Sequence, residues 1–208
     1  MSPTTVLSTG KREQTKLANR QAILDAAREV FAELGYETAT VRDIIRRTEL
    51  SVGAFYNYFR SREEVFEALA DDGARRFRPI LRACWEQAQD FEGYLRAAIQ
   101  AYFDFLADEH ESWQSRRPVG ERHPHVSMET PEMGRVFEEV REAFTAAIER
   151  GGAPRVDADY LTAACIAMAR EVGERMLMRR PIDTGAAAEF AARMILGGIP
   201  ALPRLREP

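Results

Sequence analysis

The sequence predicts an all-α fold, and three observations support that prediction. Apolar residues recur at three- and four-residue steps through most of the 208 residues, which is the spacing of one face of an α-helix. Capping residues and glycines stand where these stretches begin and end. No stretch shows the strict alternation of apolar and polar residues that is typical of a half-buried strand.

The first apolar stretch predicts a helix that ends at a glycine. Its apolar positions are Ile23, Ala26, Ala27, Val30, Phe31 and Leu34. Gly35 follows, at the place where a left-handed C-terminal cap is needed. Residues 1–16 precede the stretch, and their polar composition with Lys11, Arg12 and Lys16 predicts a flexible basic arm.

Two short helices are predicted next, with about three residues between them. Thr40 and Asp43 have the spacing of an N-terminal capping box for a helix that ends near Thr48. Ser51 caps a second helix, which is predicted to reach about Phe59 with Phe55 pointing inward. A helix, a tight turn and a short second helix form the helix-turn-helix unit, which places its second helix in the major groove of DNA.

The rest of the chain predicts a bundle of longer helices. Ser61 and Glu64 have capping-box spacing at the start of a long helix that reaches Cys84. Further helices are predicted at residues 91–106, 131–150, 157–180 and 184–199. The polar segment 111–130 predicts a lid, a binding loop or a partly disordered linker.

Charge is distributed unevenly along the chain. Residues 1–62 hold 10 Lys and Arg against 7 Asp and Glu, whereas the remainder holds 19 against 26. A basic front end on an acidic body suits a protein that contacts phosphate with one end only. The sequence has no apolar run near 18 residues and no signal-peptide pattern, so we expect a cytoplasmic protein without a membrane partner. Cys84 and Cys165 are predicted to be buried free thiols.

The segment from Ala39 to Phe66 resembles the tetracycline-repressor (TetR) family of helix-turn-helix transcriptional regulators. After Ala39 it reads TVRDIIRRTELSVGAFYNYFRSREEVF, against a family pattern like T-x-x-x-I-A-x-x-A-G-V-S-x-G-x-x-Y-x-Y-F-x-x-K-E-x-L. The stretch Ile23-Leu24-Asp25-Ala26-Ala27, together with Phe31 and Gly35-Tyr36, also matches the first helix of the family. With them the resemblance spans about 50 residues.

The resemblance implies two domains and a mode of action. A three-helix DNA-binding domain is expected over residues 17–62, with its motif at about 40–59. A larger helical ligand-sensing and dimerisation domain follows at 63–200, with a tail at 201–208. Family members usually dimerise through their last two helices and release double-stranded operator DNA when a small ligand binds, so a repressor is expected.

Carried over residue by residue, the resemblance also implies the DNA contacts. Thr40, at a helix N-terminus, is expected to hold a phosphate. Tyr56 and Tyr58 offer hydroxyl groups to phosphate, and Asn57 can pair with a base edge. The full expected set is Thr40, Arg42, Ser51, Val52, Gly53, Ala54, Tyr56, Asn57, Tyr58 and Arg62.

Two residues depart from the family pattern within the motif. Glu49 stands where the turn usually has glycine, and a left-handed conformation there would cost about 1 kcal/mol. Val52 stands where lysine or arginine is common, which removes one contact to phosphate or guanine. Both departures make the operator sequence harder to infer from relatives.

Apolar side chains from several predicted helices form a candidate ligand site. Singly they suit a packed core, and as a set they suit an apolar cavity for a hydrophobic effector. The candidates are Trp85, Tyr102, Phe103, Leu106, Trp113, Phe137, Val140, Phe144 and Met168, with Glu171 and Arg175 as either a polar anchor or an ordinary i,i+4 pair. Homodimer formation is expected through the last two helices, whose alanines allow close approach: Ala163, Ala164, Ala167, Ala187, Ala188, Ala191 and Ala192.

Two other classes of function compete with the regulator. A non-catalytic interaction protein with a degenerate helix-turn-helix would not bind DNA. An enzyme or metal protein would use His123 and His125, but no nucleophile lies in a recognisable turn near them and no cysteine accompanies them. We therefore expect no catalysis, no cofactor and no metal.

Overall fold

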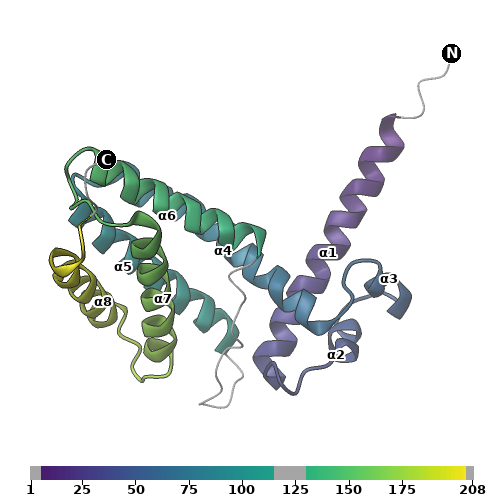
Figure 1. The fold of residues 1–208 in the computed structure, drawn as a ribbon. Helices are drawn as coiled ribbons and strands as arrows, with labels where there is room; N and C mark the ends of the chain where they lie inside the picture. The colour runs from purple at the N-terminus through teal and green to yellow at the C-terminus, as the bar shows by residue number, and fades with distance from the viewer. Residues whose placement is uncertain (1–5, 115–129, 205–208) are drawn as a thin grey trace. The chain divides into compact units, whose positions relative to one another are not determined.

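The computed structural model describes residues 6–114 and 130–204, and these contain α-helices and one short 3-10 helix but no strand (Figure 1). The all-α prediction is confirmed. The helices are α1 (Val6–Leu34), α2 (Val41–Arg46), α3 (Val52–Tyr56), α4 (Arg62–Gln87), α5 (Phe91–Gln114), α6 (Pro131–Glu149), α7 (Ala158–Leu177), α8 (Thr184–Gly198) and η1 (Ile199–Ala201).

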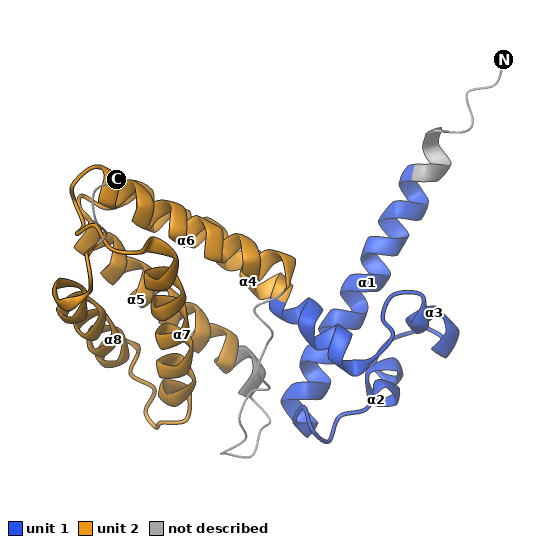
Figure 2. Cartoon of the chain, viewed as in Figure 1, with its two compact units in different colours: residues 1–70, 113–126 blue, residues 71–112, 127–208 orange. Residues whose placement is uncertain are grey.

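The described residues form two compact units that meet in the sequence between Ala70 and Asp71 (Figure 2). The first contains α1, α2, α3 and the beginning of α4, and the second contains the rest of α4 and α5 to α8. Each unit buries its own apolar cluster. The boundary lies inside α4, whereas the sequence placed it at residue 62. None of the described helices is both long and apolar enough to cross a bilayer.

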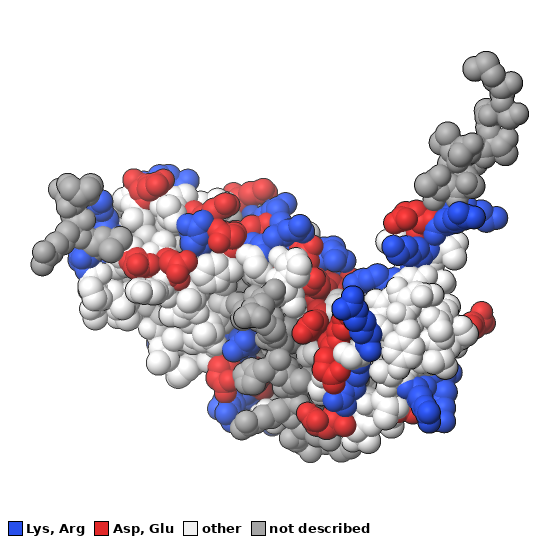
Figure 3. All heavy atoms as spheres, turned by 45° about the vertical axis from the view of Figure 1, so that its right-hand side comes forward, with Lys and Arg blue, Asp and Glu red and all other residues white. Residues whose placement is uncertain are grey.

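The first helix begins earlier than the sequence predicts. Residues 6–16, expected to form a loose arm, belong to α1. Lysine, arginine and glutamate are strong helix formers, so this basic composition favours a helix as readily as a tail. The hydroxyl of Thr15 donates a hydrogen bond to the carbonyl of Lys11 at 2.9 Å, and basic side chains are grouped on the described end of the helix (Figure 3).

The predicted helix boundaries of the first unit are confirmed where local chemistry sets them. Gly35 has a φ of 75°, and its N–H donates to the carbonyl of Phe31 at 3.1 Å. The side chain of Thr40 accepts from the N–H of Asp43, whose carboxylate accepts from the N–H of Thr40 at 3.0 Å. These hydrogen bonds lower the pKa of Asp43. Ser51 accepts from the N–H of Ala54 at 3.2 Å and caps α3.

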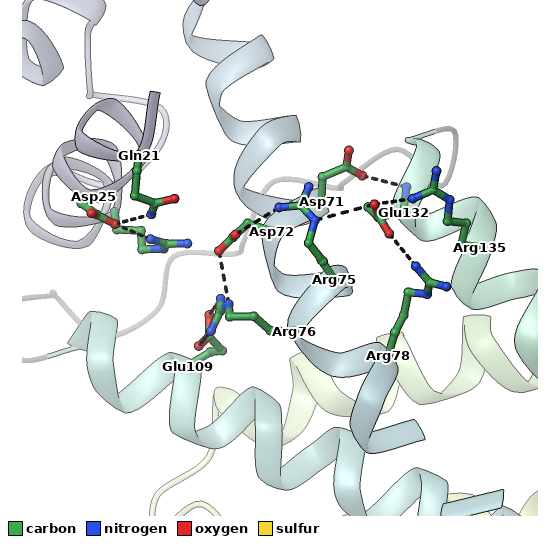
Figure 4. A network of polar contacts seen from close by, with 11 residues as sticks. Gln21, Asp25, Asp71, Asp72, Arg75, Arg76, Arg78, Glu109, Glu132 and Arg135 are labelled. Atoms are coloured by element: carbon green, nitrogen blue, oxygen red, sulfur yellow. Dashed lines mark hydrogen bonds and ion pairs between the residues drawn. The ribbon is translucent and has the colours of Figure 1, made fainter. Parts of the chain in front are cut away.

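The second unit is tied together by a network of ion pairs between α4, α5 and α6 (Figure 4). Glu132 is 7% exposed, and Arg78 and Arg135 donate to its carboxylate at 3.0 and 2.6 Å. The N–H of Glu132, in the first turn of α6, donates to Asp71 at 3.1 Å, which satisfies a backbone donor that has no partner within its own helix. A buried carboxylate costs little when it is paired in this way.

The polar segment after α5 differs from its prediction. Helix α5 was expected to end near Leu106 but continues to Gln114, and α6 begins at Pro131 as predicted. The added turns of α5 come from residues that are polar but favour helix, which a search for apolar periodicity cannot detect. Residues 115–129, and with them His123 and His125, lie outside the described part of the chain.

Gly173 allows close packing of α7 against α5. A Cβ atom at this position would lie 2.6 Å from Cδ1 of Leu106 and 3.4 Å from Cε1 of Phe103, whereas one at Gly134 in α6 would meet nothing within 4 Å. Both changes to alanine gain helix propensity, of about 1 kcal/mol. We expect Gly134→Ala to raise the free energy of unfolding by that amount. The free energy of unfolding of Gly173→Ala should be lower than that of Gly134→Ala by about 1–2 kcal/mol, because Leu106 must move. Chemical denaturation of both variants would show this, and equal stabilities would contradict it.

Candidate nucleic-acid interface

Helix α3 has one buried side and one open side. Phe55 is fully buried and Phe59, just after the helix, is 3% exposed. Val52 and Tyr56 are 57% and 53% exposed, and Ser51, Gly53 and Asn57 are exposed as well. Ala54 is half-buried. The expected base-reading residues therefore share the face of α3 that the first unit leaves open, a geometry that suits a helix entering a DNA groove.

Helix α3 is shorter than predicted. It ends at Tyr56, with Asn57 as its C-cap, instead of near Phe59. The N–H groups of Tyr58 and Phe59 both bond to the carbonyl of Phe55, at 2.9 and 3.1 Å. The chain thus turns tightly after α3, which carries Phe59 into the core.

The turn between α2 and α3 tolerates Glu49 without strain. Among the described residues no residue other than glycine has a positive φ. Glu49 therefore does not adopt the left-handed conformation that would carry a cost in free energy. Thr40 and Arg42 are exposed at the start of α2. Arg47, at the other end, bonds to Glu29 at 3.1 Å and to Glu33, both from α1. These ion pairs hold α2 against α1 and neutralise its last basic side chain.

The hydroxyl of Tyr58 has a partner that the sequence does not reveal. It accepts a hydrogen bond from Nδ2 of Asn19 at 3.1 Å. The guanidinium of Arg20 lies 5.3 Å from the ring centroid of Phe59. Tyr58 is half-buried, and its hydroxyl can still donate to an acceptor such as phosphate. These contacts bring α1 next to the end of the recognition helix, and no local sequence signal links Asn19 to Tyr58.

Arg62 was expected to reach DNA phosphate, and the structure shows its guanidinium engaged within the first unit. Its Nη1 donates to the carbonyls of Tyr36 at 2.7 Å, Glu37 at 3.1 Å and Ala39 at 3.1 Å. The guanidinium also lies 4.2 Å from the ring centroid of Tyr36 and pairs with Glu63 at 3.2 Å. Arg62 therefore holds the loop between α1 and α2. The family resemblance suggested a phosphate contact because the family pattern shows that a basic residue stands at this position. The pattern does not show where its side chain points.

Seven of the predicted ligand residues belong to the core of the second unit or pack against it: Trp85, Tyr102, Phe103, Leu106, Val140, Phe144 and Met168. The aromatic rings of this core form two groups. Trp85 packs edge-on against Tyr94 with centroids 5.1 Å apart, and Phe144 lies 6.3 Å from the same ring. Tyr102 contacts Phe77 at 5.5 Å in the other group. Members of the set that are fully or almost fully buried are Phe103, Val140 and Phe144; half-buried members are Trp85, Tyr102, Leu106, Phe137 and Met168.

The polar members of the predicted ligand site do not join this core. Glu171 and Arg175 form an ion pair at 3.0 Å, with side chains 52% and 56% exposed. They form the i,i+4 pair that was one of the two alternatives, on the open side of α7. Trp113 belongs to α5, but its side chain is not among those that the structure describes.

Several buried groups lie inside the second unit, and sequence reasoning missed one of them, Tyr94. Tyr94 is 1% exposed at the meeting point of Trp85 and Phe144. Burial raises the pKa of Tyr102 to about 12, and the charges of Arg170 and Glu174 also act on it. Cys165 is a buried free thiol, as predicted, whose pKa burial raises to about 12, whereas Cys84 is only half-buried. Burial depends on tertiary packing, so local spacing alone could not single out Tyr94.

Comparisons with known proteins agree with this geometry. Residues 23–69 match the model for bacterial regulatory proteins of the tetR family. The chain is 28% identical over 193 residues to the transcriptional activator FasR of Mycolicibacterium smegmatis, covering 90% of this chain and 85% of the relative. It is 48% identical over 58 residues to the repressor AcnR of Corynebacterium efficiens, covering 28% of this chain and 31% of the relative.

Similarity of fold extends beyond the helix-turn-helix. The regulator FadR of Bacillus subtilis, solved in complex with stearoyl-CoA, superposes with a TM-score of 0.68 at 20% identity and covers 86% of this chain and 98% of its own. The family match falls on α1 to α4, the elements that present the open face of α3. The chain is therefore similar to transcriptional regulators of the TetR family, through the match of residues 23–69 and through its fold.

Proposed function

We propose that this regulator acts as a homodimer that binds a double-stranded operator through α2 and α3 and releases it when a small apolar molecule binds the second unit. One observation carries the DNA-binding part. The side chains of Val52 and Tyr56 on the open face of α3 leave 57% and 53% of their surface to solvent, although one edge of the Tyr56 ring packs against Phe55. Exposed aromatic and polar residues on a short helix within a helix-turn-helix match the chemistry of groove and phosphate contacts.

A surface on α7 and α8 supports the dimer. Tyr160, Phe190 and Met194 are 76%, 59% and 57% exposed, and Ala163, Ala164 and Ala167 are exposed beside them in α7. The alanines of α8 make a different contribution, because Ala188, Ala191 and Ala192 are buried within their own unit. We define Tyr160, Ala163, Ala164, Ala167, Phe190 and Met194 as the α7–α8 face. Such apolar patches mark protein interfaces, and a two-fold dimer suits two half-sites about one helical turn apart.

A tyrosine variant tests operator binding at one atom. Tyr56→Phe removes only the hydroxyl, and we expect operator affinity to fall about 10-fold because a charge-assisted hydrogen bond to phosphate is lost. Thermal stability should not change, since the side chain is half in solvent. Fluorescence anisotropy with a labelled operator measures the affinity. Equal affinities of Tyr56→Phe and wild type would remove the proposed contact.

The class of ligand is proposed from the second unit and from FadR. The core between α4, α5, α6 and α7 is rich in aromatic rings, with Trp85 and Tyr102 only half-buried, and side chains of this kind suit an apolar ligand. FadR, which shares the fold, binds stearoyl-CoA. We therefore propose a ligand with a long acyl chain. A ligand can release the operator only by its difference in affinity for the two states.

Stearoyl-CoA is the probe for this proposal, with coenzyme A as its matched control. We expect stearoyl-CoA to raise the melting temperature and to weaken operator binding, since binding to the folded state stabilises it. Coenzyme A should do neither. Absence of both effects with stearoyl-CoA would reject an acyl ligand. If stearoyl-CoA tightens operator binding, the protein is a regulator that binds DNA with its ligand, and the proposed release is wrong. A chain that binds no DNA at low salt would instead be an interaction protein.

A further inference from the structure

Most of the first part of α1 is exposed to solvent. The buried residues of α1 begin at Ile23, whereas every residue from Gly10 to Ala18 is exposed. Even Leu17 is 61% exposed. A helix without a packed face is marginal in water, because most helix stability in proteins comes from burial of one side. This segment, residues 10–20, which we call the α1 extension, is therefore open to a partner along most of its length.

The charge of the α1 extension indicates the chemistry of that partner. It carries Lys11, Arg12, Lys16 and Arg20 against the single acid Glu13. Arg12, Lys16 and Arg20 follow one another at four-residue steps, so their side chains lie along one stripe of the helix. A continuous basic stripe on an exposed helix complements a polyanion.

The orientation of this stripe is set by its contacts with α3. Arg20 lies over the ring of Phe59, and Asn19, one position away, donates to the hydroxyl of Tyr58. The end of the stripe thus meets the chain just after the recognition helix. With a rise of 1.5 Å per residue, Arg12 lies about 12 Å along the helix axis from Arg20.

We infer that the α1 extension is a second DNA-contacting element, which binds backbone phosphates of the duplex outside the base pairs that α3 reads. This inference rests on the proposed operator binding and adds to it a site on a different element. Arginine and lysine on a helix can contact phosphates without reading bases. The α1 extension would then increase affinity and its dependence on salt, without changing the preferred sequence.

The test is the salt dependence of binding by Arg12→Gln/Lys16→Gln. Glutamine keeps helix propensity, and Arg20 is left in place because it contacts Phe59. The control, Arg141→Gln/Arg179→Gln, removes the same charge from the second unit. The probe is a duplex selected by the wild-type protein from a random pool, in a long form with about one extra helical turn (roughly 10 base pairs) at each end and in a trimmed form.

We expect the slope of log affinity against log salt to become shallower by about 0.9 for each lost phosphate contact, or about 1.8 per protomer. Trimming the duplex should produce the same decrease for the wild type and none for the double variant. An unchanged slope on the long duplex, or an equal decrease in the control, would overturn the inference while operator binding stands. If the wild-type protein selects no duplex from the random pool, both proposals are overturned.

Discussion

Replacing Arg62 with alanine is expected to lower the free energy of unfolding of the first unit by roughly 2–4 kcal/mol. The change removes three hydrogen bonds, to the carbonyls of Tyr36, Glu37 and Ala39, and leaves these acceptors without their partner. It also removes the contact with the Tyr36 ring. A charged donor shared by several carbonyls is worth more than an ordinary surface group, although such contributions are not additive. Urea denaturation followed by circular dichroism measures the change.

Arg62→Lys separates the two roles that have been considered for this residue. Lysine keeps the charge but lacks the planar guanidinium that reaches three carbonyls and stacks on a ring. If Arg62 positions the loop before α2, Arg62→Lys should lose most of the stability that Arg62→Ala loses. The salt slope of DNA binding should stay at its wild-type value in both variants. If the Arg62→Ala protein is stable and its slope of log affinity against log salt is shallower by about 0.9, Arg62 contacts phosphate after all.

Phe190→Glu is expected to convert the dimer into a monomer. Phe190 is 59% exposed on the α7–α8 face, and a carboxylate at the centre of an apolar interface would be buried without a partner. Light scattering after size-exclusion chromatography measures the mass. Operator affinity should fall by at least about 100-fold, because two linked half-site contacts become one.

Leu17→Glu is the matched control for this substitution. Leu17 is 61% exposed, like Phe190, but lies in the α1 extension. Its variant should keep the mass of the wild type. A Phe190→Glu protein that also keeps the wild-type mass would place the dimer contact elsewhere or show that the chain does not dimerise.

The parts of the fold that the sequence predicts well are those that local chemistry determines. The capping box of Thr40 and Asp43, the cap at Ser51 and the glycine at 35 depend on residues within four positions of one another. Their spacing is visible in the sequence, and the structure confirms each of them. The buried face of the first helix was also predicted, since its period is that of the helix itself.

The parts that the sequence does not predict depend on contacts between distant residues or on the lack of such contacts. Arg62 bonds to carbonyls 23 to 26 positions earlier in the chain, and the family pattern records only that a basic residue stands there. The α1 extension has no apolar stripe, so periodicity could not identify it as a helix. Glu171 and Arg175 have the spacing of both an anchor and a surface pair, and only their exposure decides between the two.

Selection of DNA by the purified wild-type protein tests the central proposal most directly. The protein is incubated with a pool of random-sequence duplexes at low salt, and bound molecules are recovered and sequenced over several rounds. Operator binding by a dimer predicts enrichment of an inverted repeat whose half-sites are separated by about one helical turn, roughly 10 base pairs, or a multiple of it. It also predicts that binding of the enriched duplex weakens steeply as salt rises. A pool that stays random, with no duplex retained at low salt, would contradict the proposal.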